Sequence, residues 1–306
     1  MLRYTLRRLV QLVPVLIGVS IMTFAILHAI PGDPIAVMAP ADASEEDIAG
    51  LRAEFGLDQP LPIQYLKYVG NAVQGNLGRS LRTRDPVAET LWRRLQFTIQ
   101  LTIASVVLGV ILGVVLGVVA ATHHNTWIDN TIMVTSLTLL SVPGFWLSLM
   151  LLLLFAGTLR WLPSGGTGGP QHLVLPVIVI SHGAAAVIAR FTRSSMLEVI
   201  RQDYIRTARA NGIPERLVVY RHALRNALNP VITIVGLQFG FLLGGSAIVE
   251  TIFALPGIGR LMVNAIYTRD YPVIQGGILF IALTFVLVNL LTDLVYAIVN
   301  PRIRYS

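Results

Sequence analysis

The chain has 306 residues, of which 54% are hydrophobic and only 13% are charged, whereas soluble domains carry about 25% charged residues. So little charge cannot cover a water-facing globule, which excludes a soluble enzyme and a disordered chain and predicts that a lipid bilayer surrounds much of the surface. The formal net charge is +7 and there is no cysteine, so disulfides, thiolate metal sites and cysteine nucleophiles are excluded. In a membrane chain such a positive charge is typical of basic cytoplasmic loops, and we expect no nucleic acid partner.

Six apolar stretches are long enough to cross a bilayer, which takes roughly 20 residues. Five of them are clear: residues 9–30, 97–121, 131–158, 230–252 and 273–299. The weaker sixth, 173–189, contains Pro176, His182 and Gly183; we predict a short packed span there, and a re-entrant segment is the alternative. Because the runs are continuous and lack the alternation of lipid-facing strands, the sequence predicts an all-α polytopic membrane protein.

Six spans place both termini on one side of the membrane. With the N-terminus inside, that side carries the N-terminal arginines, the arginines between residues 190 and 225, and Arg302 and Arg304. Most of the other basic residues lie in segment 31–96, which is long enough to be translocated regardless of its charge. The positive-inside rule, by which arginine and lysine gather in cytoplasmic loops, therefore predicts that both termini are cytoplasmic. A cleaved signal peptide is the alternative for the first span, but 9–30 exceeds the usual apolar region of about 7–15 residues.

These spans divide the chain into residues 1–30, an extracytoplasmic segment 31–96, and a core 97–306. In the outer segment, Ser44-Glu45-Glu46-Asp47 resembles a capping box, which predicts a short helix that ends near Gly56. We therefore expect a small folded cap, with a loosely ordered loop as the alternative.

Two sets of glycines recur at four-residue spacing, which places each set on one helical face where another backbone can approach closely. They are Gly109, Gly113 and Gly117 in the second span and Gly236, Gly240 and Gly244 in the fifth. We predict that both helices pack in the interior of the bundle. The alternative is that glycine is simply frequent in membrane helices.

Ionisable residues are sparse inside the predicted spans, and His182, Glu250 and Asp293 are the ones that we single out. Charged groups in a bilayer are costly and are functional candidates by default, so these three are candidates for a translocation path. The alternative is structural, since Glu250 and Asp293 can reach the interfaces and His182 can stay neutral and hydrogen-bonded. No ladder of carboxylates crosses the membrane, which argues against a proton-coupled pump.

The cytoplasmic segment 191–230 is predicted to be a helix, a tight turn and a second helix. An apolar stripe predicts the first helix over 195–210, Asn211-Gly212 ends it, and Pro214-Glu215 starts a helix that reaches about residue 228. Around the turn, small residues leave a low knob ringed by arginines, which suits docking into an acidic groove on another protein. The small residues are Ala208, Ala210 and Gly212, and the arginines are Arg206, Arg209 and Arg216. A basic loop that lies on anionic lipid is the alternative.

This segment resembles a known family. The spacing Arg206-Thr207-Ala208-x-x-x-Gly212 is similar to the EAA loop of binding-protein-dependent ABC importer permeases. Residues 203–210 and 222–227 resemble its peptide-transport branch, which includes dipeptide, oligopeptide, glutathione and nickel permeases. Further short matches extend over nearly the whole chain, at residues 31–34, 56–58, 192–195, 256–260, 269–272 and 300–304. The chain departs from the general EAA pattern at Arg206 and Thr207, where the family at large has Glu and Ala, and at Arg225, where it often has Pro.

The resemblance implies a type I ABC importer permease fold with six transmembrane helices, a small extracytoplasmic cap and a cytoplasmic coupling helix, in a bacterial inner membrane. It implies that ATPase coupling involves Asp203, Arg206, Thr207, Ala208, Arg209, Ala210 and Gly212. The implied partners are a second homologous permease, two ABC ATPase subunits that hold ATP and Mg, and an extracytoplasmic solute-binding protein. The chain itself is expected to bind no metal or cofactor and to be no enzyme.

One observation supports, independently of the resemblance, the expectation that ATP is hydrolysed by partner subunits and not by this chain. A P-loop needs Gly-Lys-Ser/Thr, and the only lysine, Lys67, follows Leu66. The sequence also lacks HExxH and G-x-S-x-G, which disfavours a membrane-embedded hydrolase; that enzyme class and a passive channel are the alternatives from other classes. As solutes, dipeptides or short oligopeptides are the first expectation, and glutathione or nickel chelates are the alternatives.

Overall fold

The computed structural model describes residues 2–29, 44–54 and 57–299, and the chain divides into two compact units. One unit comprises Met1–Thr98 and Pro256–Leu287, and the other comprises Ile99–Leu255 and Val288–Ser306. Within the described ranges there is no β-strand, only an isolated bridge between Arg79 and Pro86. The prediction of an all-α chain is therefore confirmed for the part of the chain that the structure describes.

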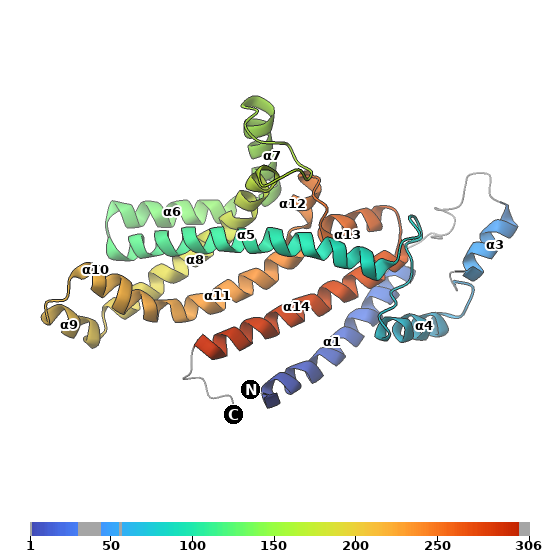
Figure 1. The fold of residues 1–306 in the computed structure, drawn as a ribbon, viewed down its shortest axis with the longest axis horizontal. Coiled ribbons are helices and arrows are strands. Elements are labelled where there is room, and N and C mark those ends of the chain that lie inside the picture. The colour runs from blue at the N-terminus through green and yellow to red at the C-terminus, as the bar shows by residue number, and fades with distance from the viewer. Residues whose placement is uncertain (1, 30–43, 55–56, 300–306) are drawn as a thin grey trace. The chain divides into compact units, whose positions relative to one another are not determined.

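The first unit consists of helices and of a loop after α4 that is bonded to the turn before α14. Its helices are α1 (Leu2–Ala29), α3 (Glu45–Glu54), α4 (Leu61–Val73), the start of α5 (Val87–Thr122), α13 (Ile258–Tyr267) and most of α14 (Tyr271–Val299) (Figure 1). The start of α3 confirms the helix expected after Ser44, whereas the Pro31-Gly32-Asp33-Pro34 motif lies outside the described residues. The buried carboxylate of Asp270 accepts hydrogen bonds from Ser80 Oγ at 2.5 Å and from the Leu81 backbone N–H at 3.0 Å. These bonds attach the loop after α4 to the turn before α14.

The second unit is built around one long helix. It contains the rest of α5, α6 (Trp127–Ser141), α7 (Gly144–Leu151), the π-helical η1 (Leu152–Thr158), α8 (Gln171–Ile200), α9 (Asp203–Ala210), α10 (Glu215–Leu217), the π-helical η2 (Val218–Ala223), α11 (Leu224–Gly245) and α12 (Ala247–Ile252). Helix α8 packs against both α6 and α11. Its middle is rich in buried alanines, including Ala184, Ala185 and Ala186, and these small side chains let neighbouring backbones approach closely.

Several predicted spans differ from the helices observed. Helix α5 starts at Val87, ten residues before the predicted second span. Helix α8 is continuous from Gln171 to Ile200, so the weak fourth stretch is a full helix rather than a re-entrant segment. It also absorbs the start of the helix expected over 195–210, which is broken where Gln202 adopts an extended conformation (φ −71°, ψ 149°) before α9.

The third predicted span is not one straight helix. The pair Trp127–Ser141 and Gly144–Thr158 is bent by 97°, because Val142, which precedes Pro143, is held in an extended conformation (φ −78°, ψ 119°). In the described part of the chain, four helices are long and apolar enough to span a membrane, or up to five if the bent pair is one span. Helix α11, which holds most of the fifth predicted span, is not among them. The count of six spans therefore remains a prediction.

Candidate coupling segment and translocation path

The segment predicted to couple to the ATPases forms a helix, a turn and a helix at one end of the second unit. Helix α8 is followed by α9, the Asn211-Gly212 turn, α10 and η2, which continues directly into α11 (Figure 1). Gly212 has φ +75°, a left-handed conformation that glycine adopts without strain, and its N–H bonds to Arg209 O at 2.9 Å. The turn therefore joins two elements that both lead into the helices predicted to span the membrane.

A hydrophobic cluster anchors this segment on the helices. Its members come from α5, α8, α9, η2 and α11: Val118, Ala121, Met196, Ile205, Ala208, Val218, Val219, Ala223 and Ala227. Helix α9 contributes Ile205, which is fully buried, and Ala208, which is 8% exposed. Because these two residues lie three apart, they occupy one face of α9 and fix it on the bundle.

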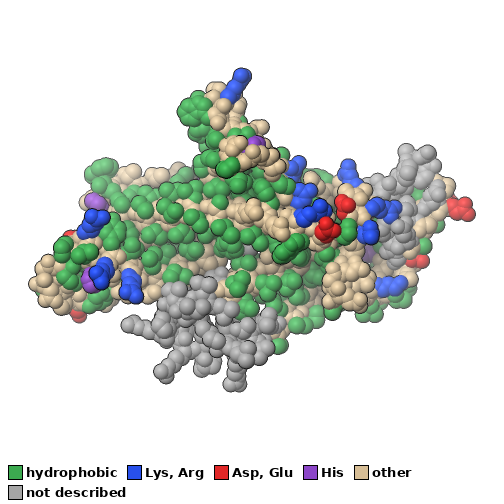
Figure 2. Space-filling model, in the orientation of Figure 1, with side chains coloured by type: hydrophobic (Ala, Val, Ile, Leu, Met, Phe, Trp, Pro, Cys, Tyr) green, Lys and Arg blue, Asp and Glu red, His purple; other side chains and the backbone are tan. Residues whose placement is uncertain are grey.

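The opposite face of α9 is open. Asp203, Arg206, Thr207, Arg209, Ala210 and Gly212 are exposed. The buried position of Ala208 corrects the expectation that it belongs to an exposed knob, since its methyl group packs inwards. Figure 2 shows basic side chains gathered at this end of the second unit, whereas hydrophobic side chains cover the length of α5. The exposed part of the segment is thus polar, basic and low in profile.

One of the arginines assigned to docking already has a partner across the turn. Arg209 Nε and Nη2 donate to the two carboxylate oxygens of Glu215 at 3.0 Å and 2.7 Å. This paired geometry holds the pKa of Glu215 below its ordinary value. In contrast, Arg206 makes only a long contact of 3.4 Å with the exposed Asp203. Arg209 therefore closes the turn, while Arg206 is available to a partner.

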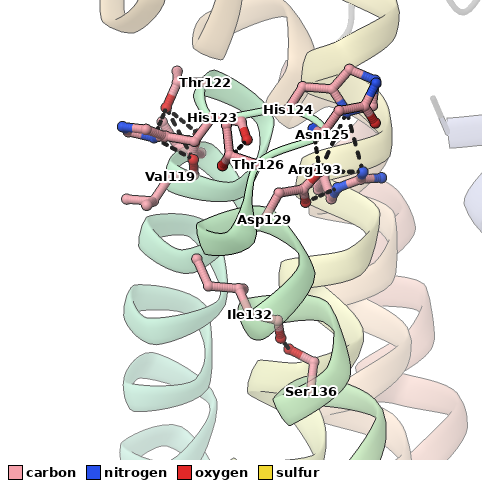
Figure 3. A network of polar contacts seen from close by, with 11 residues as sticks. Val119, Thr122, His123, His124, Asn125, Thr126, Asp129, Ile132, Ser136 and Arg193 are labelled. Carbon is pink, nitrogen blue, oxygen red and sulfur yellow. Dashed lines mark hydrogen bonds and ion pairs between the residues drawn. The ribbon is translucent and has the colours of Figure 1, made fainter.

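A buried ion pair lies near the same end of the unit, and sequence reasoning did not single it out (Figure 3). Asp129, at the start of α6, is 1% exposed and accepts hydrogen bonds from Arg193 Nε at 2.5 Å and Nη2 at 2.6 Å. The same carboxylate accepts the Asn125 backbone N–H at 3.1 Å and lies 3.3 Å from His124 Nδ1. The network fixes the turn between α5 and α6 onto α8. The one available signal was Arg193 in the motif 192–195, and no sequence feature pointed from it to a residue 64 positions away.

The glycines of the second predicted span lie against α8. A Cβ built on Gly109 would lie 3.2 Å from Ala184 Cβ, one on Gly113 would lie 2.6 Å from Ile188 Cβ, and one on Gly117 would lie 2.5 Å from Thr192 Cβ. The other face of α5 exposes a stripe of large apolar side chains, which includes Ile103, Val107, Ile111 and Val115. In the fifth span Gly236 and Gly240 are buried, and the surroundings of Gly244 are not described.

The three path candidates have different surroundings. His182 is half-buried and lines a cavity of about 330 Å³ in the second unit. Glu250 is fully buried and accepts a hydrogen bond from Ser246 Oγ at 2.8 Å, so it contributes to the start of α12 and does not line that cavity. Asp293 lies in α14, and its side chain is not described. The described residues contain no group of three or more His, Asp or Glu that could hold a metal ion.

Comparisons with known proteins fit this architecture. Residues 113–305 match the family "Binding-protein-dependent transport system inner membrane component", and residues 1–102 match the corresponding N-terminal family. The glutathione transport system permease protein GsiC of Escherichia coli O6:H1 is 47% identical over 306 residues, and that of Salmonella paratyphi A is 45% identical. In both comparisons the match covers 100% of each chain.

Solved structures show the same fold at lower identity. The inward-facing MetNI methionine ABC transporter has a TM-score of 0.58 at 22% identity, and the match covers 69% of this chain and 96% of that one. An amino acid ABC transporter with histidines has a TM-score of 0.52 at 18% identity, with 70% and 94% covered. From the full-length sequence matches, the chain belongs to the binding-protein-dependent transport system inner membrane components, the multi-pass permease subunits of ABC importers, and is a transport subunit rather than an enzyme.

Proposed function

We propose that this chain moves glutathione, or short peptides like it, across the inner membrane after delivery by an extracytoplasmic binding protein. The observation that supports this choice is the full-length identity of 47% and 45% with two glutathione permeases. The order of solutes expected from the sequence is therefore reversed. Glutathione, which is itself a tripeptide, comes first, and dipeptides and other oligopeptides become the second candidates.

In the proposed assembly, this chain pairs with a second homologous permease, two ATPase subunits that hold ATP and Mg, and one binding protein. Both termini and α9 face the cytoplasm. Binding of ATP closes the ATPase pair and pulls on the open face of α9, and hydrolysis resets the inward-facing state. Such a cycle needs an element with two positions that the partners favour differently.

The coupling residues take three roles in this proposal. Asp203, Arg206, Thr207, Ala210 and Gly212 form the surface that the ATPase grips. Arg209 holds the turn closed through Glu215. Ala208, together with Ile205, passes the movement to the bundle, because both are packed in the cluster shared with α5, α8 and α11. Displacement of α9 would then shift these helices instead of being absorbed by a flexible loop.

The test is uptake by the assembled transporter in proteoliposomes, with radiolabelled glutathione and a radiolabelled dipeptide as cargoes. Ala210→Trp adds bulk to the exposed face of α9, and Ala210→Ser is the matched control that keeps this face small. We expect the Trp variant to lose about tenfold in uptake, equivalent to about 1.4 kcal/mol of coupling, with unchanged thermal stability. Normal uptake by Ala210→Trp would contradict the coupling role, and uptake of the dipeptide without glutathione would contradict the assignment of the solute.

A further inference from the structure

Among the described residues, the cavity beside His182 is lined by elements of the second unit only. Helices α6, α7, α8, α11 and α12 contribute its walls. Its volume of about 330 Å³ falls within the range of about 300–1,000 Å³ typical of small-molecule sites. In the part of the wall that the structure describes, two side chains are polar, His182 of α8 and Gln238 of α11, and the others are apolar. Polar groups in apolar surroundings are costly unless they are hydrogen-bonded. The hydrogen-bonding groups that these two side chains present therefore decide what the cavity can bind.

His182 presents a hydrogen-bond acceptor to the cavity. Its Nδ1 lies at hydrogen-bond distance from the carbonyl oxygen of Val179, one turn earlier in α8. A carbonyl can only accept, so Nδ1 carries the proton in the neutral ring and Nε2 is left as the acceptor. Within the described residues, Nε2 has no polar partner. This atom is therefore suited to an N–H group of a ligand.

Gln238 supplies the complementary groups. Its carboxamide offers two N–H donors and one carbonyl acceptor, and it makes no hydrogen bond with any residue that the structure describes. Together the two side chains present donors for a C=O group and acceptors for an N–H group. This is the pattern that a peptide unit requires.

We propose that this cavity is a solute site on the translocation path, where Gln238 and His182 hydrogen-bond a peptide unit of the cargo. The site rests on the proposed function and adds the chemical group that is recognised. None of the described residues that line the cavity is charged, so the site is suited to bind the amide of a peptide rather than its carboxylates. A nickel chelate is a poor fit, because His182 is the only one of the described lining residues that commonly ligates nickel.

Two glycines in the wall show that the space is open. A Cβ built on Gly144 or Gly183 would meet no atom within 4 Å. A Cβ at Gly183, which lines the cavity, therefore displaces no described neighbour, and we expect a larger side chain there to occupy part of the cavity. This property provides a way to block the site without disturbing the packing.

The experiment uses the complete transporter in proteoliposomes and measures glutathione uptake per ATP hydrolysed. Gln238→Leu and His182→Leu each remove one hydrogen bond, and about tenfold less uptake per ATP is expected for each. Gly183→Leu should block uptake with unchanged thermal stability. Gln100→Leu is the matched control, because Gln100 is an exposed glutamine of α5 that does not line the cavity; its uptake should equal that of the unmodified chain.

A chemical probe separates contact with the solute from a structural role. In an ester analogue of glutathione, an oxygen replaces the N–H of the cysteinyl-glycine bond. The unmodified transporter, with its binding protein saturated, should move the ester more slowly than glutathione, whereas His182→Leu should move both at one rate. His182→Gln, which keeps an acceptor, should restore part of the difference.

The outcomes distinguish the site from the function. If the unmodified transporter takes up glutathione and the His182, Gln238 and Gly183 variants do so equally well, the site is wrong and the function stands. If a folded His182→Leu variant still discriminates against the ester, the contact at His182 is wrong. If the unmodified transporter takes up neither glutathione nor a dipeptide, the proposed function fails and the site fails with it.

Discussion

At the scale of single residues, the ion pair between Asp129 and Arg193 is the contact whose loss should be most costly. Asp129→Asn keeps the shape of the side chain but removes the charge, so the partly buried guanidinium of Arg193 loses its carboxylate. We expect the free energy of unfolding to fall by about 2 kcal/mol, the typical cost of a buried polar group left without its partner. Thermal unfolding of the purified permease, followed by circular dichroism, measures this loss.

The control for this prediction is Glu198→Gln, which neutralises an exposed carboxylate on α8, the helix of Arg193, and should leave stability unchanged. The double variant Asp129→Asn with Arg193→Gln should lose less than the sum of the two single variants, because a broken pair is counted only once. Additive losses would show that the two side chains do not stabilise each other.

Single residues also show how much of the packing could be predicted from the sequence. The spacing of Gly109, Gly113 and Gly117 follows from helix geometry alone, and all three lie against α8. The burial of Ala208 was missed because its small side chain was assigned to an exposed knob at the turn, whereas α9 starts after the break at Gln202 and packs Ala208 inwards beside Ile205. Asp129 was missed because its partner lies 64 residues away, and only the folded chain brings them together.

At the scale of elements, the contact between α5 and α8 depends on the absence of side chains. Gly117→Ala would place a Cβ at 2.6 Å from the Ala189 carbonyl oxygen and 2.5 Å from Thr192 Cβ, so the two helices must separate. We expect a loss of about 1–3 kcal/mol in the free energy of unfolding, as for other overpacked sites. Gly18→Ala in α1, where a Cβ meets nothing within 4 Å, is the matched control. Equal stability of the two variants in thermal unfolding would show that close approach at Gly117 is unimportant.

The turn after α9 should respond to pH through Glu215. Its carboxylate has a lowered pKa because Arg209 donates hydrogen bonds to it. A lowered pKa in the folded state means that the pair stabilises the turn above the ordinary carboxyl pKa of 4.5 and loses this effect as pH falls through the folded value. The protection of the Gly212 and Ile213 amides against hydrogen exchange should therefore be constant near neutral pH and fall in acid. Arg209→Gln should lower this protection near neutral pH and weaken its dependence on pH; protection equal to that of the unmodified chain at every pH would exclude the pair as the cause.

The elements also show why composition predicts spans better than it predicts their geometry. Within the described residues the apolar stretches fall mostly in helices, with breaks at Val142-Pro143 and at Ser246, because hydrophobicity determines which segments avoid water. The bend of 97° between α6 and α7 depends instead on the conformation that Pro143 imposes on Val142. The continuation of α8 beyond its apolar part to Ile200 depends on tertiary packing, since Met196 and Ile200 join the cluster under α9.

At the scale of the whole molecule, the proposal requires α9 to face the cytoplasm and the segment after α1 to face the outside. The chain has no cysteine, so a single introduced thiol reports the side of the membrane on which it lies. Gln74→Cys, at the exposed end of α4, and Ala210→Cys, on the open face of α9, are both accessible to solvent. A maleimide that cannot cross membranes should label Gln74→Cys in spheroplasts and Ala210→Cys only in inverted vesicles. The unmodified chain is the blank, and both variants should be labelled after the membrane is dissolved in detergent. Labelling of Ala210→Cys from the outside would place the coupling segment away from the ATP supply, and the proposed coupling mechanism would then be wrong.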